Sequence, residues 1–482
     1  MVNQLSIRAR ISTTPRPDPV EGDARVPDRA AAVVIGGGII GTSTALALAD
    51  KGIDVVLCEK GEIGAEQSSR NWGWCRTQGR DPREIQLSLE ANRIWRGLNA
   101  KVQGETGFRA EGVIYLCSTE SELAYYEAWL DKARIYQVDA RMLSSEEMAK
   151  LLPGATRTWL GGIYSPSAGR AEPQKAAPAI ANGARRLGAT ILTRCAVRGI
   201  EATAGRVSAV VTEAGHIVTD TVVLAGGAWS RLFCGNQGID LPQLKVRGSV
   251  MRTPPVDGAP VPSVAGSGFA FRRRLDGGYT VANRGWSVAE IVPDSFRLFF
   301  KYMPALRAQW KDLGLRIGER FLTELRTPRR WSLEAPSPFE ADRTLDPVPD
   351  THILNDAKKN LAAAFPAFAC VKVLDQWAGL IDVTPDVVPV IGPVASLPGF
   401  YIATGSSGHG FGIGPAAGAA HGGHRHRRSA THRPEAVAVR ALHRRFSLEH
   451  QLKPRSKGSC SSTLWSRCRW RSVSRSRRPR RR

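Results

Sequence analysis

A glycine-rich turn between an apolar strand and a helix constrains this chain more than any other feature. Residues 31–35 form a short, continuous apolar run of the kind that is buried in a parallel sheet. The run leads directly into GGGIIG at residues 36–41, and a helical pattern continues to residue 49. In such a turn the first glycine permits the tight bend, the second lets the backbone approach a pyrophosphate, and the third lets helix and strand pack closely.

A second apolar strand completes the unit. Residues 55–58 are apolar and end in Glu59, which lies 18 residues after the last glycine of the turn. An acid at this position can accept hydrogen bonds from an adenosine ribose, while the N-terminus of the preceding helix faces the phosphates. The strand, turn, helix and second strand therefore predict a dinucleotide-binding unit, although this unit alone does not distinguish FAD from NAD.

A polar run and two later glycine blocks bear on the choice of cofactor. The polar run, residues 67–71, comes soon after the second strand and is followed by WGWCR. Residues 221–224 form a buried strand that ends in AGGAWS, and residues 399–403 lead into a dense glycine cluster at residues 404–414. Glycine after a strand lets backbone N–H groups approach a ligand closely. The alternative, an NAD-linked Rossmann dehydrogenase, would not need the last cluster.

Three motif blocks are the glycine turn at residues 36–41, the block after residue 224 and the cluster at residues 404–414. In this order they resemble the D-amino-acid oxidase-type flavoprotein family, which includes glycine and sarcosine oxidases and D-amino-acid dehydrogenases. The resemblance implies FAD as a non-covalent cofactor. It implies that the first glycine block and Glu59 hold the pyrophosphate and ribose, and that residues 68–71 line the pyrophosphate and ribityl chain. It further implies that Val197 contacts the adenine by its backbone, residues 226–229 close over the adenosine, and residues 408–412 approach the pyrimidine end of the flavin. The implied cofactor-binding residues are Gly36, Gly38, Ile39, Ile40, Gly41, Glu59, Lys60, Ser68, Ser69, Arg70, Asn71, Val197, Gly226, Trp229, Gly408, His409, Gly410, Phe411 and Gly412.

The same resemblance spans residues 30–418 and implies an α/β fold. A discontinuous Rossmann-type FAD-binding domain is expected beside an α+β substrate domain with a mixed or antiparallel sheet. The expected FAD-binding segments are residues 29–85, 145–235 and 370–420, and the expected substrate-domain segments are residues 86–144 and 236–369. Within the substrate domain, the local patterns predict strands at 112–116, 246–251 and 278–282 and an amphipathic helix over 294–313.

The resemblance also implies a reaction, the transfer of a hydride equivalent from an amine-bearing carbon to flavin N5. The resulting imine hydrolyses to an oxo acid or aldehyde. Because the flavin supplies that chemistry, the protein mainly orients the substrate and holds its carboxylate, for which an arginine fork is suited. Several relatives carry an arginine shortly before the Thr384-Pro385-Asp386 turn, where this chain has Ile381 and Asp382. Either the carboxylate binds elsewhere, or Asp382 receives a cationic group of the substrate, or Asp382 caps a turn.

Arg76 and Arg80 are the candidate residues for binding the substrate carboxylate. They follow the polar run, and sarcosine-oxidase-like relatives place a substrate arginine just after the corresponding flavin-proximal segment. The alternative is that both are solvated or ion-paired loop side chains.

The electron acceptor is expected to be a quinone, an electron-transfer partner or oxygen. In sarcosine-oxidase-like relatives, a lysine on a substrate-domain strand activates oxygen. The corresponding strand here, residues 278–283, contains no lysine. We therefore expect a dehydrogenase rather than an oxidase.

The positive charge of the chain is concentrated at its C-terminal end. The formal net charge is +23, yet residues 421–482 hold 19 Lys and Arg against two acidic residues, whereas residues 1–420 hold 48 against 42. A nucleic-acid-binding function, the other alternative, would rest on this tail alone, and we expect no specific nucleic-acid partner. The Arg, His, Ser, Pro and Ala bias of the tail predicts disorder and is typical of a shifted reading frame in a GC-rich gene. Because the composition changes after Gly423, we also expect the amphipathic helix that follows the glycine cluster in relatives to be missing.

The cysteine pattern indicates a reducing compartment, and the hydropathy predicts no membrane span. The eight cysteines show no C-x-x-C pair and no metal-ligand spacing, and no apolar run approaches the roughly 18 residues that a membrane span needs. Residues 1–28 lack periodicity and are expected to be a flexible leader. We expect no metal, a small amine or amino acid as substrate, and a cytoplasmic location that leaves peripheral contact with the inner membrane open.

Overall fold

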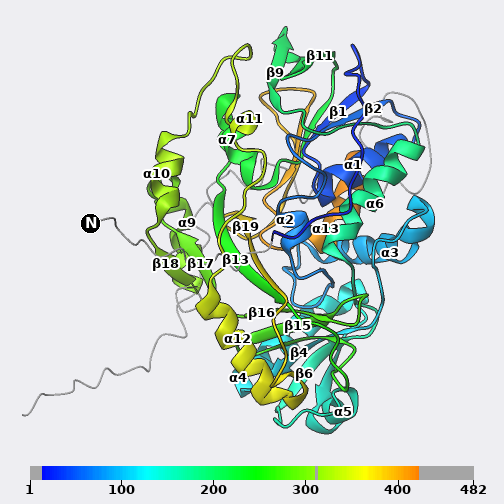
Figure 1. Ribbon diagram of the computed structural model, residues 1–482, viewed down its shortest axis with the longest axis vertical. Helices are drawn as coiled ribbons and strands as arrows, with labels where there is room; N and C mark the ends of the chain where they lie inside the picture. The colour runs from blue at the N-terminus through cyan, green and yellow to red at the C-terminus, as the bar shows by residue number, and fades with distance from the viewer. Residues whose placement is uncertain (1–13, 310–312, 423–482) are drawn as a thin grey trace, which may run out of the picture.

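The computed structural model describes residues 14–309 and 313–422, and two large sheets organise this part of the chain (Figure 1). The first sheet has six strands, and all neighbouring pairs are parallel except the edge pair β20–β21. Its strands in spatial order are β20 (Val390–Pro393), β21 (Phe400–Thr404), β12 (Val222–Leu224), β1 (Ala32–Ile35), β2 (Val55–Cys58) and β8 (Thr190–Leu192).

The four strands predicted around the glycine blocks are all present in this sheet. Every residue of β1 and β2 is buried, as expected for parallel strands that are covered on both faces. β12 pairs with β1 on the side opposite β2, and β21 then pairs with β12. Because these strands are parallel, their carboxyl ends open at the same edge of the sheet.

Four helices pack together beside this sheet (Figure 1). α1 (Ile39–Ala49) contacts α13 (Gly410–Gly422) and α6 (Pro173–Arg186), and α13 also contacts α3 (Ile85–Val102). A helix is present here up to residue 422, so the prediction that the helix after the glycine cluster is missing is wrong. α13 begins inside the cluster, and its small residues let it lie directly against α1. Residues 421 and 422 of the predicted tail belong to α13, and residues 423–482 lie outside the described residues.

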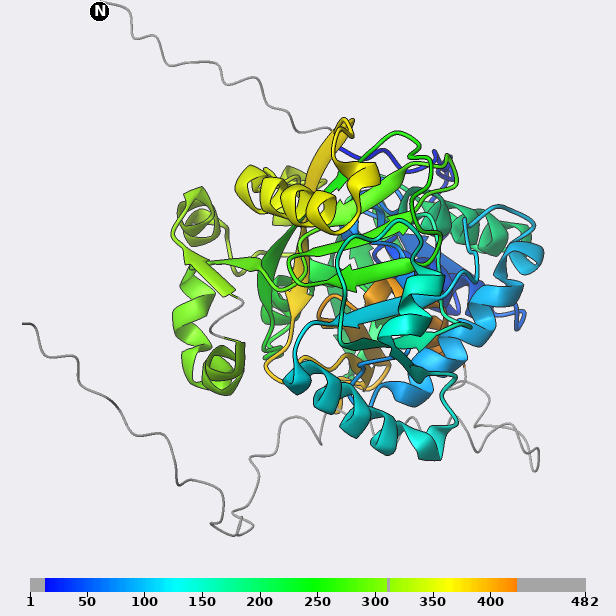
Figure 2. The same ribbon diagram turned by 90° about the horizontal axis from the view of Figure 1, so that it is seen from below.

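The second sheet is mixed, as predicted for the substrate domain. β14–β4 and β17–β18 are parallel pairs, and the other pairs are antiparallel. α12 (Thr351–Ala364) contacts β13, β15 and β16 (Figures 1 and 2). The strands in spatial order are β18 (Leu313–Arg316), β17 (Ser287–Glu290), β13 (Leu244–Arg252), β16 (Tyr279–Ala282), β15 (Phe269–Arg273), β14 (Ser263–Gly266), β4 (Val113–Cys117), β6 (Gly161–Ser165) and β5 (Arg141–Ser144), with β19 (Asp375–Val383) paired to β13.

Smaller elements surround the two sheets. The remaining strands are β3 (Trp74–Cys75), β7 (Gly169–Arg170), β9 (Val197–Thr203), β10 (Arg206–Thr212) and β11 (Gly215–Val218). The remaining helices are α2 (Gln67–Arg70), α4 (Glu120–Ala133), α5 (Ser145–Leu151), α7 (Ser230–Asn236), α8 (Pro293–Arg297), α9 (Phe299–Gln309), α10 (Glu319–Arg326) and α11 (Pro338–Ala341), with short 3-10 turns at Arg134–Tyr136, Gly227–Trp229 and Pro366–Phe368.

The pairing of two strands differs from the expected domain boundaries. β6 falls inside the range 145–235 expected for the FAD-binding domain, yet it pairs with β4 and β5 in the second sheet. β19 falls inside the expected range 370–420, yet it pairs along its whole length with β13. The register of such long-range pairs depends on side chains far away in the sequence, so the local patterns could not assign these strands to a sheet.

Two local expectations are also corrected. The helix predicted over 294–313 is two helices, α8 and α9, which are separated at Leu298, and Leu313 begins a strand instead. Of the leader predicted at 1–28, residues 14–28 are an extended segment that lies against the body, while residues 1–13 fall outside the described range. Asp18 N–H donates to the Gln174 carbonyl at 2.9 Å and Asp23 N–H to the Ile191 carbonyl at 2.7 Å. Extended backbone held by such bonds needs no apolar periodicity, which explains the misleading sequence pattern.

We expect Gly41→Ala to destabilise the fold. A Cβ at Gly41 would lie 1.8 Å from the Gly36 carbonyl oxygen, so the backbone of the turn or of α1 must shift. Overpacking of this kind costs roughly 1–3 kcal/mol of unfolding free energy, which should lower the melting temperature. Gly97→Ala is the matched control, because Gly97 lies on the exposed face of α3 with no atom within 4 Å of an added Cβ. Its melting temperature should stay the same or rise. Equal melting of the two variants would show that the close approach at Gly41 is unimportant.

Candidate functional site

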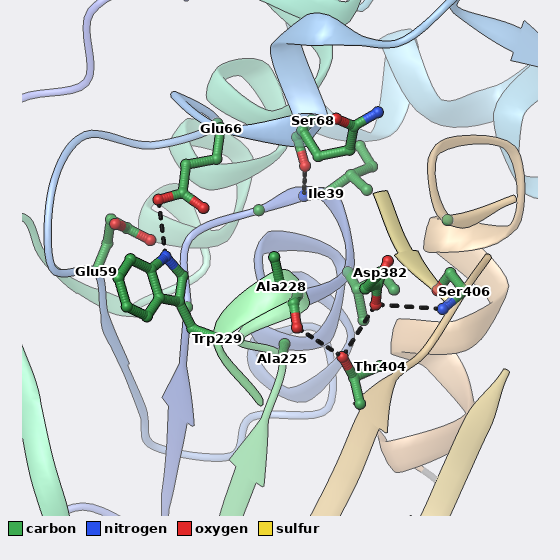
Figure 3. A pocket seen from close by; sticks show the side chains of 18 of the residues that line it. Ile39, Glu59, Glu66, Ser68, Ala225, Ala228, Trp229, Asp382, Thr404 and Ser406 are labelled. Carbon is green, nitrogen blue, oxygen red and sulfur yellow. Dashed lines mark hydrogen bonds between the residues drawn. The ribbon is translucent and has the colours of Figure 1, made fainter. Parts of the chain in front are cut away.

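Most of the predicted site residues line one cavity at the carboxyl edge of the first sheet (Figure 3). Its walls are the segments that follow β1, β2, β12 and β21, together with part of β19. Open parallel sheets bind ligands in a crevice beyond the carboxyl ends of their strands. The position of this cavity is therefore the one expected for a bound dinucleotide.

The turn after β1 forms one side of the cavity. Gly36 has φ +106°, and a Cβ on it would lie 2.6 Å from the Ala225 carbonyl oxygen, so this position requires glycine. α1 starts after Gly38 without a side-chain cap, and Ile39 N–H donates to Ser68 Oγ at 2.8 Å. The positive end of the α1 dipole therefore faces the cavity, which favours an anionic group such as a pyrophosphate there.

Glu59 lies at one end of the cavity and joins two turns. Its Oε2 accepts a hydrogen bond from Gly37 N–H at 2.6 Å, and its Oε1 accepts one from Gly61 N–H at 2.7 Å. Burial raises the pKa of the Glu59 carboxyl, while the neighbouring Lys60 charge and the two backbone bonds act in the opposite direction. The acid thus both shapes the turn and lines the cavity where an adenosine ribose would lie.

Trp229 forms a wall near the same end. Its Nε1 donates to Glu66 Oε1 at 3.0 Å (Figure 3), and Lys60 Nζ binds the same oxygen at 2.8 Å. Lys60 Nζ also lies 4.6 Å from the centre of the indole ring. Val197 lines this region from the start of β9.

The opposite end of the cavity is lined by Asp382, Ser406 and Gly408. Asp382 Oδ2 accepts hydrogen bonds from Gly405 N–H at 2.7 Å and from Ser406 N–H at 3.3 Å (Figure 3). Of the three roles considered for Asp382, these contacts show turn capping. Burial raises the pKa of its carboxyl.

Most of the residues predicted to bind the cofactor meet at this cavity, and five do not. Those that line it are Gly36, Gly38, Ile39, Ile40, Glu59, Lys60, Ser68, Asn71, Val197, Gly226, Trp229, Gly408, Gly410 and Phe411. Those that do not are Gly41, Ser69, Arg70, His409 and Gly412. The buried Arg70 guanidinium instead binds Asp346 Oδ1 at 2.6 Å and the Ala378 carbonyl at 3.0 Å, so it ties α2 to β19.

His409 points to a second, buried cluster. Its Nδ1 lies 2.8 Å from Oε2 of Glu84, a fully buried carboxylate. Burial and the nearby Arg80 charge lower the pKa of His409 to about 4. Burial, followed by the charge of Arg76, lowers the pKa of Arg80 to about 9. Arg80 is 4% exposed, and its Nε and Nη1 have no hydrogen-bond partner among the described residues.

A third arginine, missed in the sequence, joins Arg76 beside Tyr115. The guanidinium carbons of Arg76 and Arg284 lie 5.1 Å and 4.8 Å from the centre of the Tyr115 ring. Arg284 Nη2 donates to the Tyr126 hydroxyl at 2.7 Å, and Arg76 donates to the Gln78 carbonyl. Within residues 14–309 and 313–422, neither arginine forms an ion pair with a carboxylate. Arg284 follows β16 by two residues, which is the only sequence signal that could have identified it.

Known proteins resemble this chain over most of its length. A family model described as FAD dependent oxidoreductase matches residues 31–421. Mitochondrial dimethylglycine dehydrogenase of Mus musculus is 25% identical over 395 residues, which cover 80% of this chain but 41% of that protein. Glycine oxidase of Bacillus licheniformis is 29% identical over 229 residues, which cover 45% of this chain and 60% of that protein. The solved L-amino acid deaminase of Proteus myxofaciens, in complex with anthranilate, has a TM-score of 0.84 at 34% identity and covers 92% of this chain and 98% of that one.

The fold and cavity define an FAD-binding oxidoreductase. The chain belongs to the FAD-dependent oxidoreductase family that these comparisons identify, and it is an enzyme whose cofactor is FAD. The cavity fits that group, because its glycine turn has no Cβ where a pyrophosphate approaches and an uncapped helix N-terminus faces it. No helix within the described ranges is both long and apolar enough to cross a membrane.

We expect the purified protein to be yellow and to release FAD on acid or heat treatment. The contacts around the glycine turn and Glu59 are hydrogen bonds and backbone approaches, which are lost when the chain unfolds. The measurement is chromatography of the supernatant after precipitation. Recovery of NAD, absence of any cofactor, or a flavin that stays with the precipitated chain would contradict this expectation.

Proposed function

We propose that the protein oxidises the carbon–nitrogen bond of an α-amino acid. FAD, when bound, would supply the acceptor for the hydride of the amine-bearing carbon, and water would convert the resulting imine to an oxo acid and ammonia. The observation that carries the proposal is a group of three arginines, Arg76, Arg80 and Arg284, none of which has a carboxylate partner among the described residues. A buried or half-buried cation is costly unless it is paired, so such a group favours an anionic ligand.

The orientation of FAD follows from the two ends of the cavity. Gly36, Gly38 and the N-terminus of α1 would hold the pyrophosphate, and Glu59 with Trp229 would hold the adenosine. The flavin would then occupy the end lined by Asp382 and Gly408. This order supports FAD over an NAD-linked mechanism, because the glycine cluster at residues 404–414 contributes directly to the second end.

Two observations support placing the arginines near that flavin end. Asn71 lines the cavity, and Arg76 follows it after only five residues. A Cβ at Gly412 would lie 3.8 Å from Arg80 Nη2, and the adjacent Phe411 also lines the cavity. Arg76 and Arg284 would therefore bind the substrate carboxylate. The charge of the buried Arg80 would make the electrostatic potential at the carboxylate more positive.

The relatives support a substrate that carries both an amino and a carboxylate group. The Proteus myxofaciens deaminase is named for L-amino acids and was solved with anthranilate, which carries an amino group beside a carboxylate. Glycine oxidase is named for the smallest amino acid. The higher identity to the deaminase favours an L-amino acid, which a panel of both enantiomers would test directly.

Arg76→Lys should weaken catalysis on carboxylate substrates much more than it weakens FAD binding. Lysine keeps the charge but loses the two-pronged guanidinium, so kcat/KM should fall by an amount equivalent to ~2 kcal/mol. Arg83→Lys is the matched control, because Arg83 is partly exposed and already paired with Asp81 and Asp386. The kinetics are measured on the best substrate of the amino-acid panel. Unchanged kinetics in Arg76→Lys would remove this residue from the site.

The electron acceptor is proposed to be a quinone reached at a membrane surface. Eight large apolar side chains are exposed on or beside α8, α9, β18 and α10, which lie together at one side of the molecule (Figures 1 and 2). This apolar face consists of Trp286, Phe296, Phe299, Phe300, Leu315, Ile317, Leu322 and Leu325. Exposed apolar groups of this extent mark sites of protein or membrane contact. Peripheral contact with the inner membrane would bring the reduced enzyme to a lipid-soluble acceptor.

The substrate-reduced enzyme should be reoxidised faster by a quinone in anionic lipid vesicles than by air. Phe300→Ser should slow reoxidation by the vesicles but leave reoxidation by a water-soluble dye unchanged, because the Phe300 side chain is 87% exposed on the apolar face and does not line the cavity. Stopped-flow recovery of flavin absorbance measures all three rates. Faster reoxidation by air would identify an oxidase and contradict the proposed acceptor.

A further inference from the structure

The carboxylate of Asp382 is satisfied on one side only. Oδ2 receives four hydrogen bonds, all from uncharged donors. These donors are Gly405 N–H at 2.7 Å, Ser406 N–H at 3.3 Å, Thr404 Oγ1 at 3.2 Å and Gln243 Nε2 at 3.2 Å. None of these four donors, and no other residue in the described part of the chain, donates to Oδ1. Asp382 itself lines the cavity.

Two cations linked to Asp382, one across β13 and one through Gln243, are engaged with other carboxylates. Lys245 is its cross-strand neighbour on β13, but Lys245 Nζ binds Glu324 Oε1 at 3.1 Å. Arg231 donates its backbone N–H to Gln243, while its guanidinium binds Asp294 at 2.7 Å and Asp240 at 3.2 Å. These two positive charges are therefore directed elsewhere. Among the described residues, Asp382 receives hydrogen bonds from backbone and uncharged side-chain donors and forms no ion pair.

The flavin would meet Asp382 with its polar edge. In the proposed function Glu59 would hold the adenosine and the N-terminus of α1 the pyrophosphate, so the ring system would lie at the end that contains Asp382. The pyrimidine edge of a flavin carries one N–H donor between two carbonyl acceptors. An ionised carboxylate can only accept, so its free oxygen is complementary to that N–H alone.

We propose that Asp382 accepts a hydrogen bond from the pyrimidine N–H of the bound flavin through Oδ1 and lowers the reduction potential of the flavin. Reduction adds negative charge to the pyrimidine ring, and an adjacent anion in a water-poor cavity opposes this change. The N-terminus of α13, which starts at Gly410, acts in the opposite direction but is unaffected by a change at Asp382. Lowering the potential in this way suits an enzyme that passes electrons to a separate acceptor. The inference rests on the proposed binding mode of FAD.

The test compares the flavin midpoint potential of Asp382→Asn with that of the unmodified holoenzyme, by anaerobic reduction against reference dyes. The potential should rise in Asp382→Asn, because the charge is removed while the size of the side chain is kept. FAD affinity should fall at least several-fold, because the amide presents a donor toward the flavin N–H. Asp386→Asn is the matched control, since Asp386 lies in the same turn region but pairs with Arg83 at the surface. Its potential should not move.

A bound flavin with an unchanged potential in Asp382→Asn would overturn the inference. If Asp382→Asn holds no flavin, Asp382→Ser is measured instead, because it keeps a small acceptor for Gly405 N–H. Loss of flavin from both variants, with a normal Asp386→Asn control, would also overturn it by making Asp382 a requirement for binding rather than a determinant of potential. Neither measurement uses an amino acid. Absence of FAD from the unmodified protein would therefore identify a failure of the proposed function, distinct from a failure of this inference.

Discussion

The close approach of α1 to the turn after β1 is the constraint on which the site depends. Gly41 meets the Gly36 carbonyl without room for a Cβ, and Gly36 in turn lies against the Ala225 backbone after β12. These two contacts bring the N-terminus of α1 and the ends of two neighbouring strands to the same edge of the sheet. The cavity exists because three backbone segments meet there without intervening side chains. The helix packing of α13 on α1 then brings the last glycine cluster to the other end of that cavity.

Charge is arranged differently in the scaffold and in the site. The buried Arg272 guanidinium binds both oxygens of Glu172 at 2.9 and 3.0 Å and also donates to the Trp72 carbonyl, so this buried pair is fully satisfied. Arg80 instead has two guanidinium nitrogens with no hydrogen-bond partner among the described residues, and Asp382 forms no ion pair with any of them. Because an unpaired buried charge destabilises a fold, such groups mark positions where ligand binding outweighs stability. In the proposed mode, cations receive the substrate and an anion faces the cofactor.

Local sequence patterns were sufficient for the dinucleotide unit and insufficient for the surroundings of the substrate. The strands β1, β2, β12 and β21 and most cofactor-lining residues were predictable, since short apolar runs and glycine positions follow directly from backbone sterics. Arg284 was not, because its role depends on Tyr115, which lies on a different part of the second sheet. His409 belongs to the predicted glycine cluster, yet its side chain turns to Glu84 on a distant segment. Residues 14–28 show no apolar periodicity because backbone hydrogen bonds and only two packed apolar side chains, Val20 and Val26, hold them against the body.

The amino-acid sequence by itself determined the cofactor unit and its family resemblance. Its signals are the glycine turn, the acid after the second strand and the two later glycine blocks. Each signal spans only a few residues, so short-range sterics decide its conformation. Only the tertiary structure decided the sheet to which β6 and β19 belong, and which arginines lie together. It also decided that Asp382 caps the turn before α13. The physical reason is that strand pairing and electrostatic pairing join residues from tens to well over a hundred positions apart, and neither leaves a periodic signal in the local sequence.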